Sequence, residues 1–329
     1  MENMALVTVV IPNYQGIKFI EGCLSSLLSQ EEGTPSFEVL VVDNASDDGS
    51  AEVIAEKFPE VRLICLEENT GFCHAVNVGI QNSESPYVLL LNNDTKVASD
   101  FVKSLWLAIL EGEGDPEHKV FAVSAAMLTW DKPEILDGAG DIYTIFGWAL
   151  ARGKGKPYAQ YEKRERVFSA CGGAAIYRRE VFDEIGLFDE NHFAYLEDLD
   201  LGWRANLRGY LNLYEPKARV LHYGSASTGA RYNAWKTRRA AANSIYVISK
   251  NLPLLLKVLH FPFLLAGFVI KQIFFVRKRL GKAYFQGIMD GLRLSFSKEG
   301  RKRKLRFQKK HIQDYLRVEG ELLTGIFRR

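Results

Sequence analysis

Three polar residues, Asn92, Asn93 and Asp94, directly follow a run of apolar residues in the first third of the chain. The run, Tyr87–Leu91, is typical of a buried central strand in a parallel sheet that helices cover on both faces. Ligands of open α/β sheets bind at the carboxyl ends of such strands. A carboxylate beside two amides could hold a divalent cation, a ribose or a diphosphate there. A hydrophilic turn without any ligand would give the same pattern.

A second group of acids lies in the second half of the chain, where Glu197, Asp198 and Asp200 stand close together. The apolar spacing that follows predicts a helix beginning here, so that all three carboxylates fall in its first turn, where the helix dipole favours negative charge. Neighbouring carboxylates raise one another's affinity for a proton, which suits a general base. Complementing the dipole is the alternative role. Asp200 is expected to pair with Arg204, one helical turn later.

Several other residues could contact a ligand. A lone histidine at a strand end, such as His222 after residues 219–221, is more often structural than a ligand. Gly172 and Gly173 could let a ligand approach the backbone, or could simply form a turn. A segment of small residues, 225–230, precedes arginines whose guanidinium groups suit phosphate, although a solvated basic helix face is equally compatible. These arginines are Arg231, Arg238 and Arg239.

Strands and helices alternate through the first 95 residues. This order favours a doubly wound, mostly parallel α/β sheet, in which the strand-end residues Asp43, Asn44 and Asn92–Asp94 meet at one edge. The predicted strands are residues 6–11, 37–42, 61–66 and 87–91, and the predicted helices are residues 18–30, a segment ending at Phe58, and one that carries Ala75, Asn77 and Gly79.

The ordered set of motifs resembles the inverting family 2 glycosyltransferases of the GT-A fold, and within them the rhamnosyltransferase-like branch. No single motif is specific, but the full order is, and it covers about residues 6–250. The matching segments are residues 9–14, 43–50, 69–72 with Ala75 and Asn77, 91–95, 171–179, 186–190, 195–204 and 216–222.

The resemblance implies a nucleotide-sugar donor bound at the first group of strand ends. Asp43 could accept a hydrogen bond from a pyrimidine N–H and Tyr14 could pack near that ring, although Asp43 could equally cap the following helix. The donor-binding residues implied in this way are Pro12, Asn13, Tyr14, Asp43, Asn69, Gly71, Asn77, Asn92 and Asn93.

The resemblance also implies a divalent cation, Mg²⁺ or Mn²⁺, held by Asp94 and His222. Both are hard ions that prefer oxygen ligands and keep waters that substrate phosphates can replace. The family's usual acid-x-acid motif is altered here, because Asn92 replaces the first acid. An amide oxygen is a weaker ligand, so direct contact between Asn92 and the cation is left open.

For catalysis, the resemblance assigns the general base to Asp198, the second acid of the Glu-Asp pair. Glu197 would then hold acceptor hydroxyls or orient Asp198. The diphosphate of donor or acceptor would contact Arg231, Arg238 or Arg239. The acceptor-binding residues implied are Gly172, Gly173, Ala174, Glu197 and Arg204.

The charge is unevenly distributed. Residues 1–249 contain 23 basic and 35 acidic residues, whereas residues 250–329 contain 19 basic and 5 acidic residues. Apolar blocks alternate with basic clusters at 277–279 and 301–304, which predicts helices lying on the cytoplasmic leaflet of a membrane. The longest charge-free stretch, residues 258–270, is short for a membrane span. An apolar dimer face with solvated basic loops is the alternative, and the apolar blocks disfavour nucleic acid as the partner.

Other features narrow the class of protein. The four cysteines are scattered, which supports neither a zinc site nor a disulfide framework and fits a reducing compartment. The amino-terminal apolar run is too short for a signal peptide. Neither a dinucleotide-binding glycine fingerprint nor a phosphate-binding Walker loop occurs, and a nucleotidyltransferase would want a basic triphosphate loop near the amino terminus.

The sequence therefore predicts a GT-A domain over residues 1–249, with a nucleotide-binding half (1–100) and an acceptor half (101–249), followed by a membrane-associating helical tail over 250–329. The predicted activity is a metal-dependent inverting transfer, with dTDP-L-rhamnose as donor and a saccharide or polyprenyl-diphosphate-linked acceptor. The enzyme would lie peripherally on the cytoplasmic side of the membrane, and an oligomer is possible. Another UDP, GDP or dTDP sugar, or a non-catalytic nucleotide-binding scaffold subunit, is the alternative.

Overall fold

The computed structural model describes residues 5–112, 119–224 and 232–328. Within those residues the centre is a mixed sheet of ten strands, in the order β10-β12-β6-β11-β4-β1-β2-β3, with β5 paired to β12 and β7 to β6. A separate hairpin is formed by β8 and β9. The strands are β1 Val7–Asn13, β2 Phe37–Asp43, β3 Arg62–Cys65, β4 Tyr87–Leu91, β5 Thr95–Val97, β6 Val120–Thr129, β7 Lys132–Gly138, β8 Asp141–Tyr143, β9 Ala149–Ala151, β10 Glu165–Val167, β11 Ala174–Arg178 and β12 Leu211–His222.

The amino-terminal half has the alternation expected from the sequence. β1 pairs in parallel with β2 and β4, and β2 pairs in parallel with β3, so the carboxyl ends of these strands lie at one edge of the sheet. The register places Asn13 directly opposite Asp43. The expected α/β class and the buried strand at Tyr87–Leu91 are confirmed. The helices of this half are α1 Ile20–Leu28, α2 Ser50–Lys57, α3 Phe72–Gln81 and α4 Phe101–Glu111.

The second half extends the sheet with both strand directions. β11 lies antiparallel between β4 and β6, and β12 runs parallel to β6. β12 is much longer than the predicted strand at 219–221, and its last residues pair with β5, directly after Asp94. The helical segments here are α5 Val181–Ile185, α6 Glu197–Asn206 and the 3₁₀ turns η2 Tyr158–Gln160 and η3 Glu190–His192.

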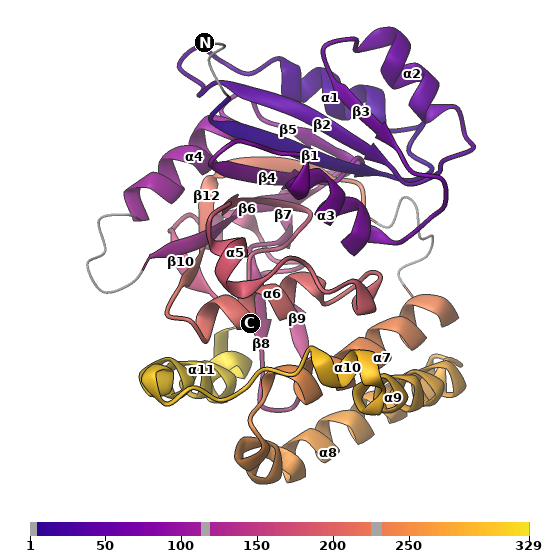
Figure 1. The fold of residues 1–329 in the computed structure, drawn as a ribbon, viewed down its shortest axis with the longest axis vertical. Helices are drawn as coiled ribbons and strands as arrows, with labels where there is room; N and C mark the ends of the chain where they lie inside the picture. The colour runs from indigo at the N-terminus through magenta and orange to yellow at the C-terminus, as the bar shows by residue number, and fades with distance from the viewer. Residues whose placement is uncertain (1–4, 113–118, 225–231, 329) are drawn as a thin grey trace.

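Helices cover both faces of the sheet (Figure 1). One apolar cluster packs α1, α2 and α4 against one face, and a second packs α3, α5 and α6 against the other. Because β4 is buried on both faces, all five of its residues are apolar, as its continuous apolar run predicts. This rigid sandwich fixes the strand ends from which the candidate site is built.

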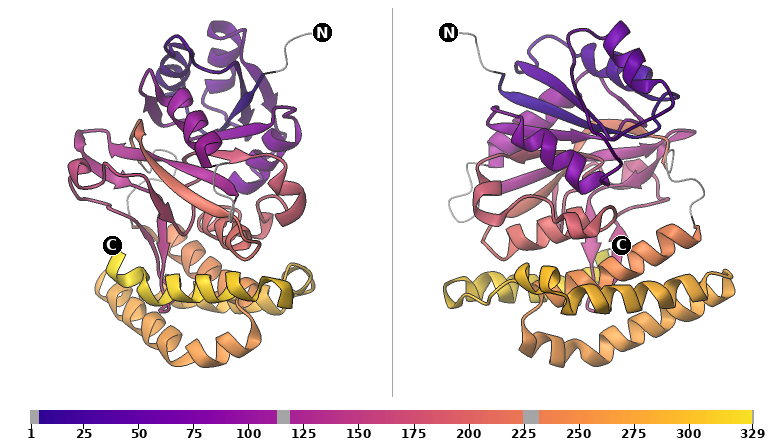
Figure 2. Two further views of the ribbon diagram at one scale, coloured as in Figure 1. Left: turned by 90° about the vertical axis from the view of Figure 1, so that its left-hand side faces the viewer. Right: turned by 45° about the vertical axis from the view of Figure 1, so that its right-hand side comes forward.

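The carboxyl-terminal helices form a layer across the end of the molecule opposite the amino-terminal half (Figure 2). A third apolar cluster joins this layer to α6 through α7 and α11. The predicted domain boundary after residue 249 falls inside α7, which continues to Asn251. The elements of the layer are α7 Ala234–Asn251, α8 Leu254–Arg277, α9 Gly281–Phe296, α10 Lys298–Lys302, η4 Lys309–His311, α11 Ile312–Thr324 and η5 Gly325–Arg328.

Candidate active site

A cavity of about 1430 Å³ lies at the carboxyl ends of β1 and β4. The end of β12, the first turn of α6 and the start of α7 complete its wall. Most residues expected to bind donor, cation or acceptor line this single space, although they come from distant parts of the chain. The sequence-predicted residues that line it are Pro12, Asn13, Tyr14, Asn69, Gly71, Asn92, Asn93, Asp94, Gly173, Glu197, Asp198, His222 and Arg239.

A buried polar network lies at the ends of β1, β2 and β4, where the donor is predicted to bind. The Asn93 amide donates to the Asn13 side-chain oxygen at 2.7 Å, and the Asn13 amide donates to Asp43 at 2.7 Å and to Ser50 at 2.8 Å. Asp43 is 2% exposed and also accepts the backbone N–H and hydroxyl of Ser46. Since each partner fixes the next, Asn13 and Asn93 are held in defined orientations where they line the cavity.

Asp94 and His222 meet in the cavity, as the sequence predicts. The antiparallel pairing of β5 with β12 sets His222 opposite Thr95, and the distance from His222 Nε2 to Asp94 Oδ1 is 3.3 Å. The backbone N–H of Tyr223 also donates to the Asp94 carbonyl at 3.0 Å. One carboxylate and one imidazole that face a polar cavity form a donor set suited to a divalent cation with open positions.

The other ring nitrogen of His222 contacts a carboxylate that the sequence did not reveal. Nδ1 lies 2.8 Å from Oδ2 of Asp137, at the end of β7, and Asp137 in turn pairs with Lys154. Burial disfavours the imidazolium, but the hydrogen bonds with Asp137 and Asp94 outweigh it and raise the pKa of His222 to about 9. A carboxylate behind a histidine is the usual partner that orients a metal-binding imidazole, so the donor set fits the expected cation.

Asp198 lies in the first turn of α6 and is held by two backbone donors. The N–H of Gly172 donates to one carboxylate oxygen at 3.1 Å, and the N–H of Leu199 donates to the other at 2.7 Å. Burial raises the pKa of Asp198 above its usual value, against these hydrogen bonds, which lower it. A buried carboxylate with a raised pKa and access to the cavity can act as a general base.

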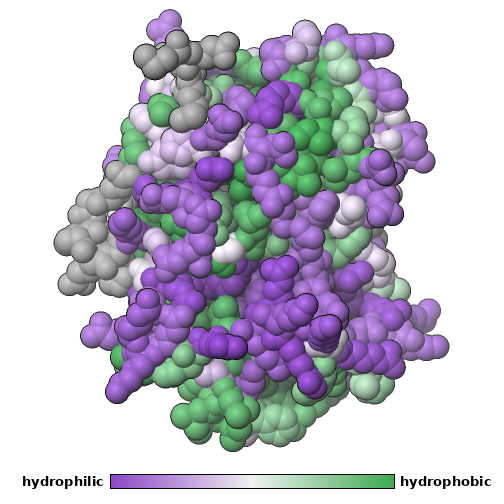
Figure 3. All heavy atoms as spheres, in the orientation of Figure 1, coloured by the Kyte–Doolittle hydropathy of each residue, from purple (hydrophilic) through white to green (hydrophobic). Residues whose placement is uncertain are grey.

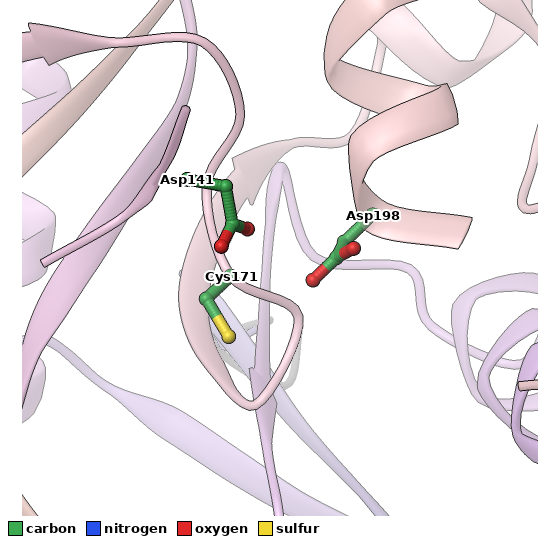
Figure 4. Close-up of side chains that lie close together, drawn as sticks. All are labelled: Asp141, Cys171 and Asp198. Atoms are coloured by element: carbon green, nitrogen blue, oxygen red, sulfur yellow. The ribbon is translucent and has the colours of Figure 1, made fainter. Parts of the chain in front are cut away.

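Two further side chains point toward Asp198 (Figure 4). Ligand atoms of Asp141, Cys171 and Asp198 all lie within 4.8 Å of one another. Burial and the charge of Asp198 raise the pKa of Asp141 well above its usual value. Each of two carboxyl groups this close disfavours the charge of the other, and the backbone donors at Asp198 favour the charge on that residue.

Near Asp198, the cavity wall combines a further acid with aromatic rings. Burial, followed by the charge of Asp198, raises the pKa of Glu197 well above its usual value, and among the described residues its Oε2 atom has no hydrogen-bond partner. The ring of Trp235 contacts Phe193, with centroids 6.2 Å apart, and the guanidinium of Arg239 lies 5.2 Å from the centre of the Phe193 ring. Hydroxyl acceptors, ring faces and a cation suit a sugar attached to an anionic group.

Two residues predicted for the donor site do not line the cavity. Asp43 is not among the described residues that line the cavity, because its oxygens are engaged with Asn13 and Ser46 beneath it. It is also not the cap of α2, whose N-cap is Gly49. Asn77 is likewise outside the cavity lining, since its amide bonds the backbone of Phe188 in both directions.

Several residues predicted to bind acceptor or diphosphate also lie away from the cavity lining. Arg204 is 5% exposed, pairs with Asp200 as expected, and donates to the carbonyls of residues 185–187, so it supports α6 instead of binding an acceptor. Arg238 pairs with Asp290 of α9. The described residues that line the cavity do not include Arg204, Arg238, Gly172 or Ala174. Arg231 lies outside the described residues.

Several lining residues were missed. Asp137 and Asp141 flank the short glycine-containing segment 138–140, and two acids on either side of glycines were an available signal. Trp235 and Lys236 begin α7 and carried no signal of their own, because exposed aromatic and basic residues are common at helix starts.

Comparison with known proteins agrees with this geometry. Residues 8–186 match the model of the family "Glycosyl transferase family 2". An N-acetylglucosaminyl-diphospho-decaprenol L-rhamnosyltransferase of Mycobacterium tuberculosis (strain H37Rv) is 28% identical over 251 residues, covering 68% of this chain and 78% of that protein. The O-antigen biosynthesis protein RfbC of Myxococcus xanthus is 29% identical over 234 residues, covering 68% of this chain and 18% of that protein.

Solved structures share the fold. GalNAc-T7 with UDP, GalNAc and Mn²⁺ superposes with a TM-score of 0.60 at 18% identity, covering 75% of this chain and 48% of that chain. The mannosyltransferase PcManGT of Pyrobaculum calidifontis, in complex with GDP-Man and Mn²⁺, gives a TM-score of 0.51 at 17% identity, covering 98% of this chain and 88% of that chain. The GT-A arrangement and the family match together show that this chain is a glycosyltransferase and belongs to glycosyl transferase family 2.

Proposed function

We propose that this enzyme transfers L-rhamnose from dTDP-L-rhamnose to a saccharide or polyprenyl-diphosphate-linked acceptor, in the synthesis of a cell-surface polysaccharide. The observation that carries the proposal is the convergence of the Asp94–His222 pair and Asp198 on one cavity. The sugar and acceptor are supported by the mycobacterial relative, whose name states an L-rhamnosyl transfer to a diphospho-decaprenol saccharide.

The residues of the cavity divide the reaction between them. Asn13 and Asn93 orient the donor. The oxygen of the acceptor hydroxyl attacks the sugar carbon while its proton passes to Asp198, and the bond from that carbon to the diphosphate breaks. This single displacement inverts the configuration at that carbon. A divalent cation held by Asp94 and His222 would offset the charge of the departing diphosphate.

We also propose that the carboxyl-terminal layer lies on the cytoplasmic face of a membrane. Among the described residues, α8 is the one helix long and apolar enough to cross a bilayer, and only 11% of its most apolar window is buried. One face of the helix is tied to the rest of the protein, because Trp148 donates to the Gly267 carbonyl at 3.1 Å and His260 pairs with Glu319. A helix held along one side in this way suits a position in the membrane plane.

The exposed side of the layer has the chemistry of a membrane surface. An apolar patch covers the end of the molecule where α8 lies, and a hydrophilic band adjoins it (Figure 3). Basic residues at 277–279 and 301–304 belong to the same layer, and each would contribute about 1 kcal/mol on anionic lipid. Large apolar side chains exposed on α8 include Leu254, Leu255, Val258, Leu259, Phe261, Leu265, Val269, Ile270, Ile273 and Val276.

The test pairs a donor screen with one variant. Thermal shift with Mg²⁺ or Mn²⁺ should show stabilisation by dTDP-L-rhamnose above that by UDP and GDP sugars, because bound ligand raises the melting temperature. The purified enzyme should then transfer rhamnose to a diphosphate-linked saccharide. Asp198→Asn should lower kcat by roughly 10³-fold or more while the affinity for dTDP stays within about threefold, since the carboxylate acts on the acceptor proton.

Asp183→Asn, at an exposed acid of α5, is the matched control and should retain full activity. Transfer by Asp198→Asn at the wild-type rate would remove Asp198 from the role of base. Stabilisation by a UDP or GDP sugar alone would favour the alternative donor while keeping the mechanism.

A further inference from the structure

The backbone of the loop that leads into α6 is strained. Phe193, Tyr195 and Leu196 have positive φ angles of 60°, 73° and 66°. Residues with large or branched side chains disfavour this region. At Phe193, with ψ at −58°, the N–H of Ala194 donates to the His192 carbonyl at 2.6 Å, which closes a γ-turn of the rare positive-φ kind. Such a backbone persists only where its surroundings hold it in place.

One buried amide of α7 lies within hydrogen-bond distance of three carbonyls of this loop, which the Trp235 ring of the same helix also contacts. The amide nitrogen of Asn243 lies 3.0 Å from the His192 carbonyl oxygen, 2.9 Å from that of Ala194 and 2.7 Å from that of Tyr195. Asn243 is 1% exposed, so water does not compete for these bonds. An amide group offers two hydrogens and the carbonyls number three, so the contacts are shared. Without the Asn243 amide, the Ala194 and Tyr195 carbonyls would lose these hydrogen bonds inside a buried, strained turn.

The loop is held from the opposite side as well. The N–H of Cys73 donates to the Phe193 carbonyl at 3.2 Å, and a Cβ at Gly71 would lie 2.5 Å from the Phe193 ring. The far end of α7 is anchored to α6, since Lys250 pairs with Asp200 at 2.8 Å and both groups are buried. The loop is therefore clamped between the start of α3 and a helix that is itself fixed to α6.

We propose that Asn243 is a positioning residue for sugar transfer, because it holds residues 193–196 in the strained form that directs Glu197 and Asp198 into the cavity. This inference rests on the proposed function. The donor-side groups, such as Asn13, are supported by a separate network at the strand ends. Replacing Asn243 should therefore lower the rate of transfer by displacing Glu197 and Asp198. It should leave the binding of the nucleotide unchanged.

The test compares Asn243→Asp and Asn243→Ala with Ser244→Ala. Ionised aspartate has the shape of asparagine but cannot donate to the three carbonyls, whereas the Ser244 hydroxyl donates within α7, to the Ala240 carbonyl. Both Asn243 variants should lose on the order of 10²-fold in kcat, since a small misplacement of a catalytic group has this effect. Their affinity for dTDP should stay within about threefold of wild type, and Ser244→Ala should match wild type.

A rescue experiment separates positioning from general stability. Glycine adopts the left-handed conformation freely, so Leu196→Gly in the Asn243→Ala background should recover at least about tenfold in kcat over Asn243→Ala alone. Full activity of Asn243→Asp would overturn the inference. So would loss of cooperative melting in both Asn243 variants, which would assign the residue to fold stability. If the wild-type protein transfers no sugar, the proposed function fails instead.

Discussion

At the scale of single residues, the site separates two kinds of acid by their surroundings. Asp94 and Asp137 flank His222 and form a group suited to a cation. Asp198 and Asp141 lie close to each other in a second group, which is suited to moving a proton. The two groups differ in their surroundings, because Asp94 and Asp137 lie against the His222 ring, whereas burial and the charge of Asp198 raise the pKa of Asp141.

Asp137→Asn should weaken the affinity for Mn²⁺ about 10- to 100-fold, as expected for loss of a carboxylate behind a metal-binding histidine. The His222 ring would lose the acceptor at 2.8 Å that orients it. Calorimetric titration of Mn²⁺ in the presence of dTDP measures the effect. Asp131→Asn, an exposed acid near the same strand, serves as the control. Unchanged Mn²⁺ affinity in Asp137→Asn would contradict this arrangement.

The pH dependence of transfer should show which of two neighbouring carboxyl groups, Asp141 or Asp198, acts as the base. Burial raises the pKa of Asp198, so transfer should fall as the pH drops through a value above the usual pKa near 4, where the base becomes protonated. Asp141→Asn resembles the protonated Asp141, so we expect its kcat at neutral pH within about threefold of wild type and the same acid limb. The measurement is kcat against pH. A large loss at neutral pH in Asp141→Asn would show that the charge, and with it the base, lies at Asp141.

At the scale of elements, short segments that meet across the sheet edge set the geometry. The pairing of β5 with β12 brings Asp94 to His222, and the strained loop before α6 packs against the start of α3. Gly71 marks this second contact, with φ at 87° and ψ at 169°, a conformation that is nearly exclusive to glycine. The cavity therefore depends on close backbone approach as well as on its acids.

Gly71→Ala should reduce the free energy of unfolding by about 1–3 kcal/mol, because the residue would be strained and its Cβ would lie 2.5 Å from the Phe193 ring. Gly22→Ala on the exposed face of α1 is the matched control. No described atom lies within 4 Å of its added Cβ, and helix propensity should raise its stability by about 0.5–1 kcal/mol. Urea unfolding measures both changes, and equal stability of the two variants would contradict the close packing at Gly71.

At the scale of the whole molecule, the carboxyl-terminal helical layer contacts the rest of the protein through more than one of its helices. α7 holds the loop before α6, α11 packs against α6, and α8 presents its free side outward. The positive charge lies in the carboxyl-terminal layer, whereas the cavity is lined by acids. The proposed membrane contact would use the first of these and the proposed transfer the second.

Binding to vesicles that contain anionic lipid should depend on the free side of α8. Replacing Leu255, Leu259 and Phe261 together by serine should weaken binding at least about tenfold, since each buried apolar side chain contributes about 1.5–3 kcal/mol. Added salt should weaken it further through the basic clusters. Co-sedimentation measures binding, with Leu107→Ser on α4 as the control. Equal binding by the triple variant and the control would place the membrane contact elsewhere.

The sequence by itself determined the class of fold and the kinds of group in the site. Strand and helix alternation over the first 95 residues and the apolar run at Tyr87–Leu91 require a buried parallel sheet, because such a run is stable only when both faces are covered. Asp94 was singled out because it follows a buried strand, where polar groups gather at the sheet edge. The roles predicted for Asp198 and His222 came from the resemblance of the ordered motifs to the family, because local pattern alone left a structural role open for each.

Only the tertiary structure decided which of these groups meet, and which residues hold them. Asp137 and Asp141 lie in the site because β7 and β8 place them there. Asn243 of α7 is hydrogen-bonded to the loop before α6. Arg204 and Asn77, which were predicted to bind ligands, make buried hydrogen bonds with Asp200 and Phe188. The reason is physical: a hydrogen bond or a shared proton depends on distances of a few ångströms, and contacts between residues far apart in the chain arise only when the whole sheet and its helices have packed.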